Sequence, residues 1–126
     1  MNMNYENSST AYKQKLDKMR AEAKQGDFYF ANFFINSGEI RKAPILVVGN
    51  DNDAIDIVIC ICTSQPSRGD WDKRVYLSKP TYVRTNKLYT IRREQLIFKI
   101  QHTLTAQKFN EIMDSVKAVF INSLTS

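Results

Sequence analysis

Histidine and cysteine are scarce in this sequence, which holds one histidine, His102, and two cysteines, Cys60 and Cys62, among 126 residues. A zinc site takes its ligands from several such residues, and a Ser-His-Asp triad needs a histidine beside its nucleophile. The sequence also lacks a Gly-rich phosphate-binding loop. We therefore expect no metal and no cofactor, and we expect His102 to be a hydrogen-bonded structural residue.

The two cysteines alternate with isoleucine on one expected strand, so their side chains share a face and are poorly placed to form a disulfide. We expect both to be reduced core residues of a cytoplasmic protein. Long apolar runs are missing too. No stretch is long enough to cross a bilayer, and the N-terminus lacks the apolar core of a signal peptide, so we expect no membrane association.

Positive charge is in excess. Eighteen Lys and Arg against thirteen Asp and Glu give a net charge of +5 and a pI near 9.3. This balance favours a polyanionic partner such as nucleic acid. The length fits one domain that buries its own core.

Residues 57–62 form an apolar, mostly β-branched run that ends on Thr63, Ser64 and Gln65. A run of this length, followed by a segment with Pro and Gly, is typical of a central strand. The strand brings two hydroxyls and an amide to its end, where binding and catalytic groups are often found.

Five further segments have strand patterns and are separated by turn residues: 28–34, 45–48, 74–77, 82–91 and 96–102. A polar turn at 36–39 follows the first segment. A helix is expected after Thr105, its N-cap, with an apolar face that extends to Phe120. Together these elements predict a mainly β (α+β) fold, a small, strongly bent sheet or barrel of five to six short strands with a C-terminal helix packed on it.

The N-terminal residues differ from the rest. Residues 1–10 are rich in Asn and Ser, and we expect them to be disordered or frayed. A Lys-rich helix should follow and end at Gly26. Its narrow apolar stripe, which should dock on the barrel or on a partner subunit, consists of Tyr12, Leu16, Met19 and Ala23. We therefore divide the chain into an N-terminal tail with a helical extension (1–25) and a barrel domain (26–126).

Cations and hydroxyls gather at the expected strand boundaries. Arg41 and Lys42 precede the strand at 45–48, Thr63 and Ser64 end the central strand, and Arg84, Asn86 and Lys87 follow Pro80. Fixed cations and hydroxyls suit in-line attack at a phosphodiester, where negative charge builds up on the phosphate oxygens.

The order of segments resembles the MazF/PemK family of toxins from bacterial toxin–antitoxin systems. Four motifs and a closing helix carry the resemblance: Gly26–Phe30, Arg41–Val48 with its proline at Pro44, Cys62–Gln65, Val83–Ile91, and the helix that opens at Leu104. The match covers residues 26–124. It leaves out the N-terminal helix.

The resemblance implies an SH3-like barrel, a homodimer and a cognate antitoxin as partner, in a complex that binds DNA. It also implies an endoribonuclease that cuts single-stranded RNA, such as mRNA, at short sequences without a metal. In the family the RNA 2′-hydroxyl attacks the neighbouring phosphorus and leaves a 2′,3′-cyclic phosphate and a 5′-hydroxyl. The threonine that family members use is matched by Thr63.

The family arginine before the proline is not matched, because Ala43 stands in its place. In an extended segment Arg41 shares the face of Ala43 and Lys42 does not, so Arg41 is the first candidate to replace it. The family's acidic residue and second arginine are Asn86 and Tyr89 here. We expect Arg41 and Thr63 to be catalytic. The residues expected to bind RNA are Lys42, Ser64, Gln65, Arg84 and Asn86.

Structural roles compete with these assignments. Thr63 and Ser64 could cap a strand, and Arg84 could pair with Glu94. Tyr82, Tyr89 and Trp71 could stack on RNA bases or pack in the core.

Two other functions fit the sequence. A barrel without an arginine at position 43 could bind RNA or an antitoxin without cutting, in which case Ala43→Arg should raise activity. A toxin of this fold could instead target a protein such as a topoisomerase.

Overall fold

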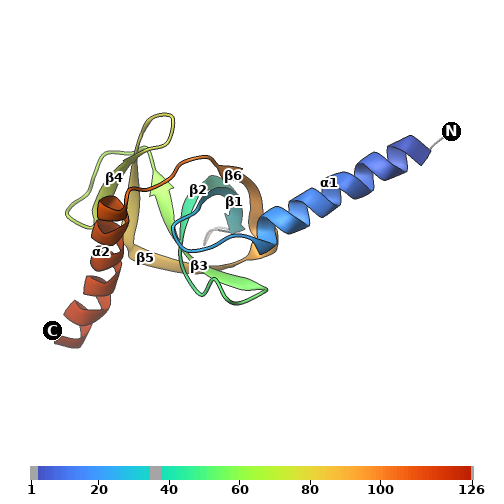
Figure 1. The fold of residues 1–126 in the computed structure, drawn as a ribbon. Coiled ribbons are helices and arrows are strands. Elements are labelled where there is room, and N and C mark those ends of the chain that lie inside the picture. Colours follow the sequence, from blue (N-terminus) through green and yellow to red (C-terminus); the bar gives the residue numbers. More distant parts are fainter. Residues whose placement is uncertain (1–2, 35–37, 126) are drawn as a thin grey trace.

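The computed structural model describes residues 3–34 and 38–125 (Figure 1). Six strands form one antiparallel sheet in the order β4-β5-β3-β2-β1-β6. The strands are β1 (Phe28–Phe34), β2 (Ile40–Gly49), β3 (Asp56–Thr63), β4 (Asp72–Tyr76), β5 (Pro80–Arg92) and β6 (Leu96–Ile100). Helix α1 (Met3–Ala21), the short 3₁₀ helix η1 (Arg93–Gln95) and helix α2 (Ala106–Thr125) complete the chain. The mainly β barrel with a C-terminal helix and an extra N-terminal helix is confirmed.

Both faces of the central strands are apolar, as expected for strands covered on two sides. In β2, Ala43, Ile45 and Val47 join one core cluster, whereas Leu46 and Val48 join the other. Helix α2 covers the second cluster with Ile112 and Val116, as its predicted apolar face requires. That face ends earlier than predicted, because Phe120 is exposed. The predicted cap is present, since Thr105 Oγ1 accepts a hydrogen bond from the Lys108 N–H at 3.1 Å.

Strand β3 lies between β2 and β5, the central position that its apolar run predicts. Cys60 and Cys62 both face the second cluster as free thiols, so the prediction of reduced core cysteines is confirmed. Burial raises the pKa of Cys60 to about 12 and that of Cys62 further still. Neither thiol is therefore a nucleophile near neutral pH.

Strand β2 begins five residues before the predicted start. The prediction that Arg41 and Lys42 precede this strand is therefore wrong: both lie within it and pair with Phe33 and Asn32 of β1. The longer ladder with β1 draws these residues into the sheet. Residues 36 and 37 of the predicted turn lie outside the described residues.

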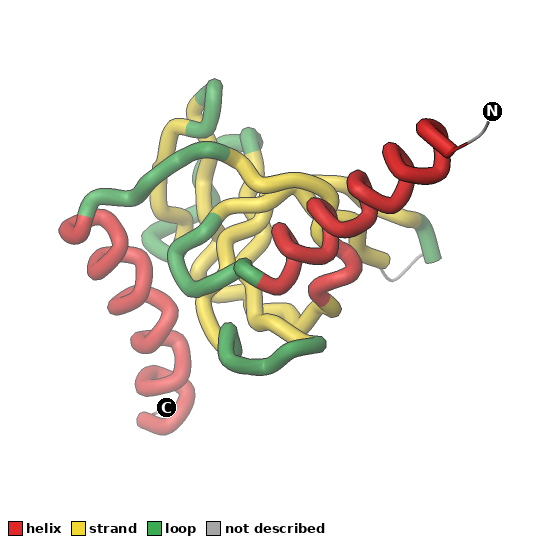
Figure 2. Tube along the Cα trace, turned by 45° about the vertical axis from the view of Figure 1, so that its right-hand side comes forward, coloured by secondary structure: helices red, strands yellow, loops and turns green. Residues whose placement is uncertain are grey.

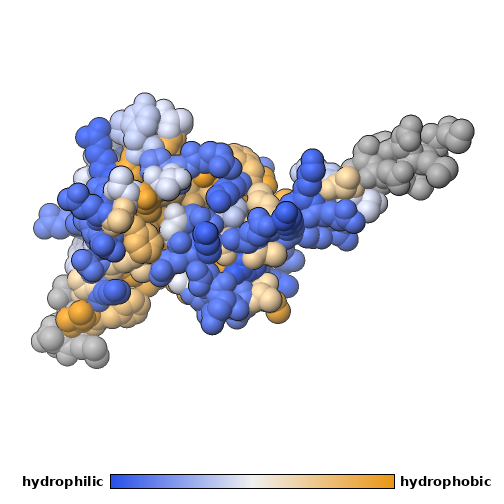
Figure 3. All heavy atoms as spheres, viewed as in Figure 1, coloured by the Kyte–Doolittle hydropathy of each residue, from blue (hydrophilic) through white to orange (hydrophobic). Residues whose placement is uncertain are grey.

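Helix α1 begins at Met3, which corrects the expectation of a disordered or frayed stretch over the described part of residues 1–10. It ends at Ala21 rather than at Gly26. Only the end of the apolar stripe docks, because Ala23 is buried and Met19 packs on the first cluster, whereas Tyr12 is exposed. The helix projects away from the barrel, and the coloured part of its surface is mostly hydrophilic (Figures 1, 2 and 3).

Arg93 fixes the barrel end of α1. Its guanidinium donates to five backbone carbonyls: those of Arg20, Ala21, Ala23, Asp51 and Asp53, at 2.7–3.4 Å. The residue is 6% exposed. We call these six residues the Arg93 cluster; it ties the end of α1 to the turn between β2 and β3.

His102 follows β6, which ends at Ile100 and is two residues shorter than predicted. Its ring is half-buried and meets the ring of Phe28 edge-on at 5.4 Å. It is therefore held by packing, and among the described contacts its ring has no hydrogen bond. In the described part of the chain, no helix is long and apolar enough to span a membrane.

Candidate functional site

A cavity of about 150 Å³ opens beside the end of β3, and we call it the Thr63 pocket. It is lined by residues from β2, β3, β5 and the loop after β3: Arg41, Ile61, Thr63, Gln65, Arg68, Arg84, Lys87 and Tyr89. The β2–β3 ladder ends at Ile45 and Ile61. Beyond that pair the two strands are free to part, which leaves room for the pocket.

Thr63 is the last residue of β3 and is only 8% exposed. Its Oγ1 accepts a hydrogen bond from the Gln65 N–H at 3.1 Å. The hydroxyl therefore caps the strand end, as the structural alternative proposes. Its own proton is still available to donate to a ligand in the pocket.

Arg41 lines the pocket and Lys42 does not. The two alternate in β2, and Arg41 shares the face of Ala43, as the period of a strand requires. Arg41 is exposed, and its guanidinium has no hydrogen bond or ion pair among the described residues. Ala43 is 6% exposed and belongs to the core, so its side chain faces the first cluster.

Arg84 enters from β5 and forms an ion pair with Asp72 of β4, with Nη1 and Oδ2 3.3 Å apart. The alternative pairing with Glu94 is wrong, because Glu94 pairs with Arg92 instead, at 3.2 Å. Arg84 thus has a structural partner and also lines the pocket.

The structure brings four of the predicted site residues together, namely Arg41, Thr63, Gln65 and Arg84. It leaves Lys42, Ser64 and Asn86 out of the lining, although all three are exposed. The pocket adds two cations that were not among the expected RNA-binding residues, Arg68 and Lys87. The signal for Lys87 lay in its place within the segment after Pro80, whereas Arg68 lies in a Pro- and Gly-containing loop whose path no pattern predicts.

Charge in the pocket is of one sign. Four cations line it, and the lining includes no carboxylate. Among the described contacts only Arg84 is paired, so the side chains of Arg41, Arg68 and Lys87 are available to an anion. The described residues contain no group of three or more His, Cys, Asp or Glu that could hold a metal ion.

An apolar groove of about 250 Å³ adjoins the pocket and shares Ile61 and Tyr89 with it. Tyr89 is 45% exposed, so its side chain is accessible to a ligand. Of the three aromatic residues considered for stacking, Tyr89 is the one in the pocket. Trp71 lines another cavity beside α2, and Tyr82 is half-buried.

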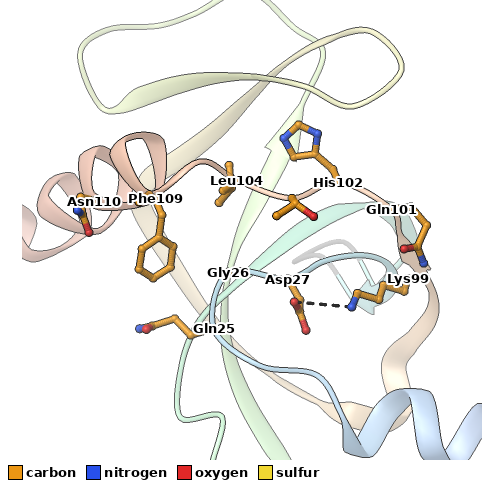
Figure 4. Close-up of a pocket in the computed structure, with 11 residues that line it drawn as sticks. Gln25, Gly26, Asp27, Lys99, Gln101, His102, Leu104, Phe109 and Asn110 are labelled. Carbon is orange, nitrogen blue, oxygen red and sulfur yellow. Dashed lines mark ion pairs between the residues drawn. The ribbon is translucent and has the colours of Figure 1, made fainter.

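A larger cavity of about 400 Å³ lies between the start of β1, the end of β6 and α2 (Figure 4). Asp27 and Lys99 point toward each other across it and form an ion pair at 3.8 Å. Phe109 packs against Gly26, where an added Cβ would lie 3.3 Å from the ring. The charges of Asp27 and Lys99 in this larger cavity are paired with each other, whereas most of the cations in the Thr63 pocket are unpaired among the described contacts.

Comparison with known families matches residues 24–120 to the PemK-like, MazF-like toxin of type II toxin–antitoxin systems. The chain belongs to this family. The match excludes the whole of α1. A comparison with curated protein sequences gave no match.

Solved structures share the fold of this PemK-like, MazF-like toxin. An endoribonuclease from a mycobacterial species, in complex with its cognate antitoxin, has a TM-score of 0.65 at 16% identity, with 78% of this chain and 94% of that chain covered. MazE–MazF from Deinococcus radiodurans has a TM-score of 0.64 at 15% identity, with 78% of this chain and 95% of that chain covered. Mycobacterium tuberculosis toxin MazF-mt6 has a TM-score of 0.59 at 14% identity, with 74% of this chain and 96% of that chain covered.

Proposed function

We propose that this MazF-like toxin is an endoribonuclease that cuts single-stranded RNA, including mRNA, at short sequences without a metal. The observation that supports this most strongly is the Thr63 pocket, where four cations surround a threonine hydroxyl and the lining includes no carboxylate. Such a pocket complements the negative charge that builds up on a phosphate during displacement. The adjoining apolar groove offers a place for a base next to that phosphate.

In the proposed reaction the RNA 2′-oxygen forms a bond to the adjacent phosphorus while the bond from phosphorus to the 5′-oxygen breaks. The 2′-hydroxyl loses its proton to solvent, and the departing 5′-oxygen gains one. Arg41 and Thr63 contact the phosphate oxygens, and Arg84 with Gln65 holds the strand. Lys42, Ser64 and Asn86 lie outside the pocket lining, so we assign them at most contacts with more distant nucleotides.

Arg41 supplies the cation that the family places at position 43. The first cluster and the pocket lie on the same side of the sheet, since Ile61 packs on the cluster and lines the pocket, and Ala43 is buried within the cluster. A cation that serves the pocket therefore has to come from another position. Arg41 lies on the same face of β2, lines the pocket and has no partner among the described residues. Its long side chain replaces the missing arginine without changing the strand.

The partners follow from the family. We propose that the chain binds a cognate antitoxin, as the mycobacterial and Deinococcus proteins do, and that it is a cytoplasmic homodimer. We also propose that residues 26–126 form the toxin domain and residues 1–25 an extension of it.

The test is incubation of the purified protein with single-stranded RNA in excess chelator, followed by analysis of the new ends. We expect 2′,3′-cyclic phosphate and 5′-hydroxyl ends, and a Thr63→Ala protein that cuts at least about tenfold more slowly. Products with other ends would exclude the mechanism. A Thr63→Ala protein as fast as the parent would exclude Thr63 from it.

The second candidate is a module that binds RNA or an antitoxin without cutting. One observation favours it: the pocket lining includes no imidazole or carboxylate to accept the 2′-hydroxyl proton. This function predicts that RNA binds in the pocket and is recovered whole. A toxin directed at a topoisomerase differs from both, because it predicts growth arrest with RNA intact and no response to Thr63 substitution.

A further inference from the structure

One buried carboxylate connects two cations of the Thr63 pocket. Asp72 Oδ2 accepts a hydrogen bond from Arg84 Nη1 at 3.3 Å and another from the Arg68 backbone N–H at 2.8 Å. The Asp72 side chain is 4% exposed, against 11% for Arg84, and it does not itself line the pocket. Asp72 therefore contacts two residues of the pocket without lining the cavity itself.

The same residue closes the loop that carries Arg68. The Asp72 N–H donates to the Gly69 carbonyl at 3.1 Å, and the Ser67 hydroxyl donates to that carbonyl at the same distance. Pairing of β4 with β5 sets Asp72 directly opposite Arg84. Residues 67–72 thus form a compact turn anchored on β4, and Asp72 lies where the turn meets the sheet.

We propose that Asp72 is a positioning residue of the Thr63 pocket, which aims the Arg84 guanidinium and the Arg68 loop at the RNA strand held in the pocket. The proposal rests on the proposed function of the pocket. Among the described contacts only one guanidinium nitrogen of Arg84 is bonded, so its other donors are available to phosphate oxygens. A bond to the backbone at Arg68 leaves the side chain of that residue free as well.

Electrostatics alone predicts the opposite effect of Asp72. A carboxylate beside a phosphate site weakens the attraction of RNA, so its removal should tighten binding. A gain from Asp72 has to come from geometry, because small displacements of catalytic groups cost large factors in rate. Loss of the Asp72 charge should change KM, whereas loss of the geometry that Asp72 fixes should change kcat.

The test compares Asp72→Asn with Asp70→Asn, which removes the same charge from the same loop. Asp70 is exposed, lies outside the Thr63 pocket and has no side-chain bond among the described contacts. We expect Asp72→Asn to lower kcat for RNA cleavage by about tenfold to a hundredfold with KM unchanged or lower. Asp70→Asn should leave kcat unchanged. In an Arg84→Ala background, Asp72→Asn should lower kcat less than it does in the parent.

A second measurement does not depend on cleavage. Hydrogen exchange of the Arg68 amide should accelerate in Asp72→Ala and not in Asp70→Asn, and the NMR signals of the Arg84 guanidinium should shift only in the Asp72 variants. If the parent leaves RNA whole, the proposed function fails, and these spectra still decide whether Asp72 holds both groups. Equal kcat in the two Asn variants, or unchanged Arg68 exchange in Asp72→Ala, would overturn the proposal.

Discussion

Arginine has opposite roles in two regions of this toxin. In the Arg93 cluster, a buried guanidinium donates to five backbone carbonyls. In the Thr63 pocket, Arg41 and Arg68 are exposed, and their guanidiniums have no partner among the described residues. Unpaired cations around a hydroxyl are available to a ligand, whereas a guanidinium whose three nitrogens all donate to backbone carbonyls stabilises the fold. The excess of positive charge in the sequence therefore includes arginines that stabilise the fold and arginines that are available to a ligand, and only their contacts in the structure distinguish the two.

The largest effect is expected at the Arg93 cluster. Arg93→Met leaves carbonyls at the end of α1 and in the turn after β2 without their donor, so the free energy of unfolding should fall by about 3–5 kcal/mol. Arg93→Lys should recover only part of this, because an ammonium lacks the planar fork. Urea unfolding measures both.

The matched control is Arg92→Met. Arg92 is exposed and forms a surface ion pair with Glu94, which contributes about 1 kcal/mol at most. Equal losses in the Arg92 and Arg93 variants would show that the carbonyl contacts add nothing to stability.

The second effect is expected at Arg41, in activity rather than stability. Arg41→Ala should lower kcat/KM for RNA by about a hundredfold or more, because it removes a cation from the developing charge. Its free energy of unfolding should change by less than about 0.5 kcal/mol, as is usual for an exposed residue without a partner.

Lys42→Ala is the control for Arg41. It removes the same charge one residue along β2, from the side that does not line the pocket. A loss of activity equal to that of Arg41→Ala would mean that only the overall positive charge matters, and the distinction between the two faces of β2 would fail.

The smallest effect concerns Ala43. An arginine there would be expected to raise activity if the position faced the pocket. Because Ala43 lies in the core, we expect Ala43→Arg to lower the free energy of unfolding by about 1–3 kcal/mol without raising RNA cleavage. Ala54→Arg, at an exposed position, should leave stability unchanged. Faster cleavage by a fully stable Ala43→Arg protein would show that the position does reach the phosphate.

Strand patterns predicted much of the fold, because alternation and β-branched runs report burial directly. They placed β3 at the centre and Arg41 on the face of Ala43. They failed where contacts distant in sequence decide the outcome. Pairing with β1 extended β2 through Lys42, and α1 continues to Met3 although its Asn and Ser content suggested a frayed end.

The site was predicted only in part, because some of its residues lie in strands and others are placed by contacts distant in sequence. Thr63 and Arg84 stand at fixed places in strands, so their positions followed from the pattern. Arg68 reaches the pocket from a loop that Asp72 shapes, and Asp72 acts through a cross-strand pair that no local spacing reveals. Arg93 binds carbonyls from two distant segments, and the sequence contains no sign of them.

Attack by the 2′-hydroxyl is tested with two RNA strands of one sequence, one of them with a 2′-deoxy nucleotide at the cleavage position. The proposed chemistry predicts that both bind the protein equally and that only the full RNA is cut, to a 2′,3′-cyclic phosphate. Both events should weaken together in Arg41→Ala. Cleavage of the deoxy-substituted strand at that position would contradict attack by the 2′-hydroxyl in the Thr63 pocket.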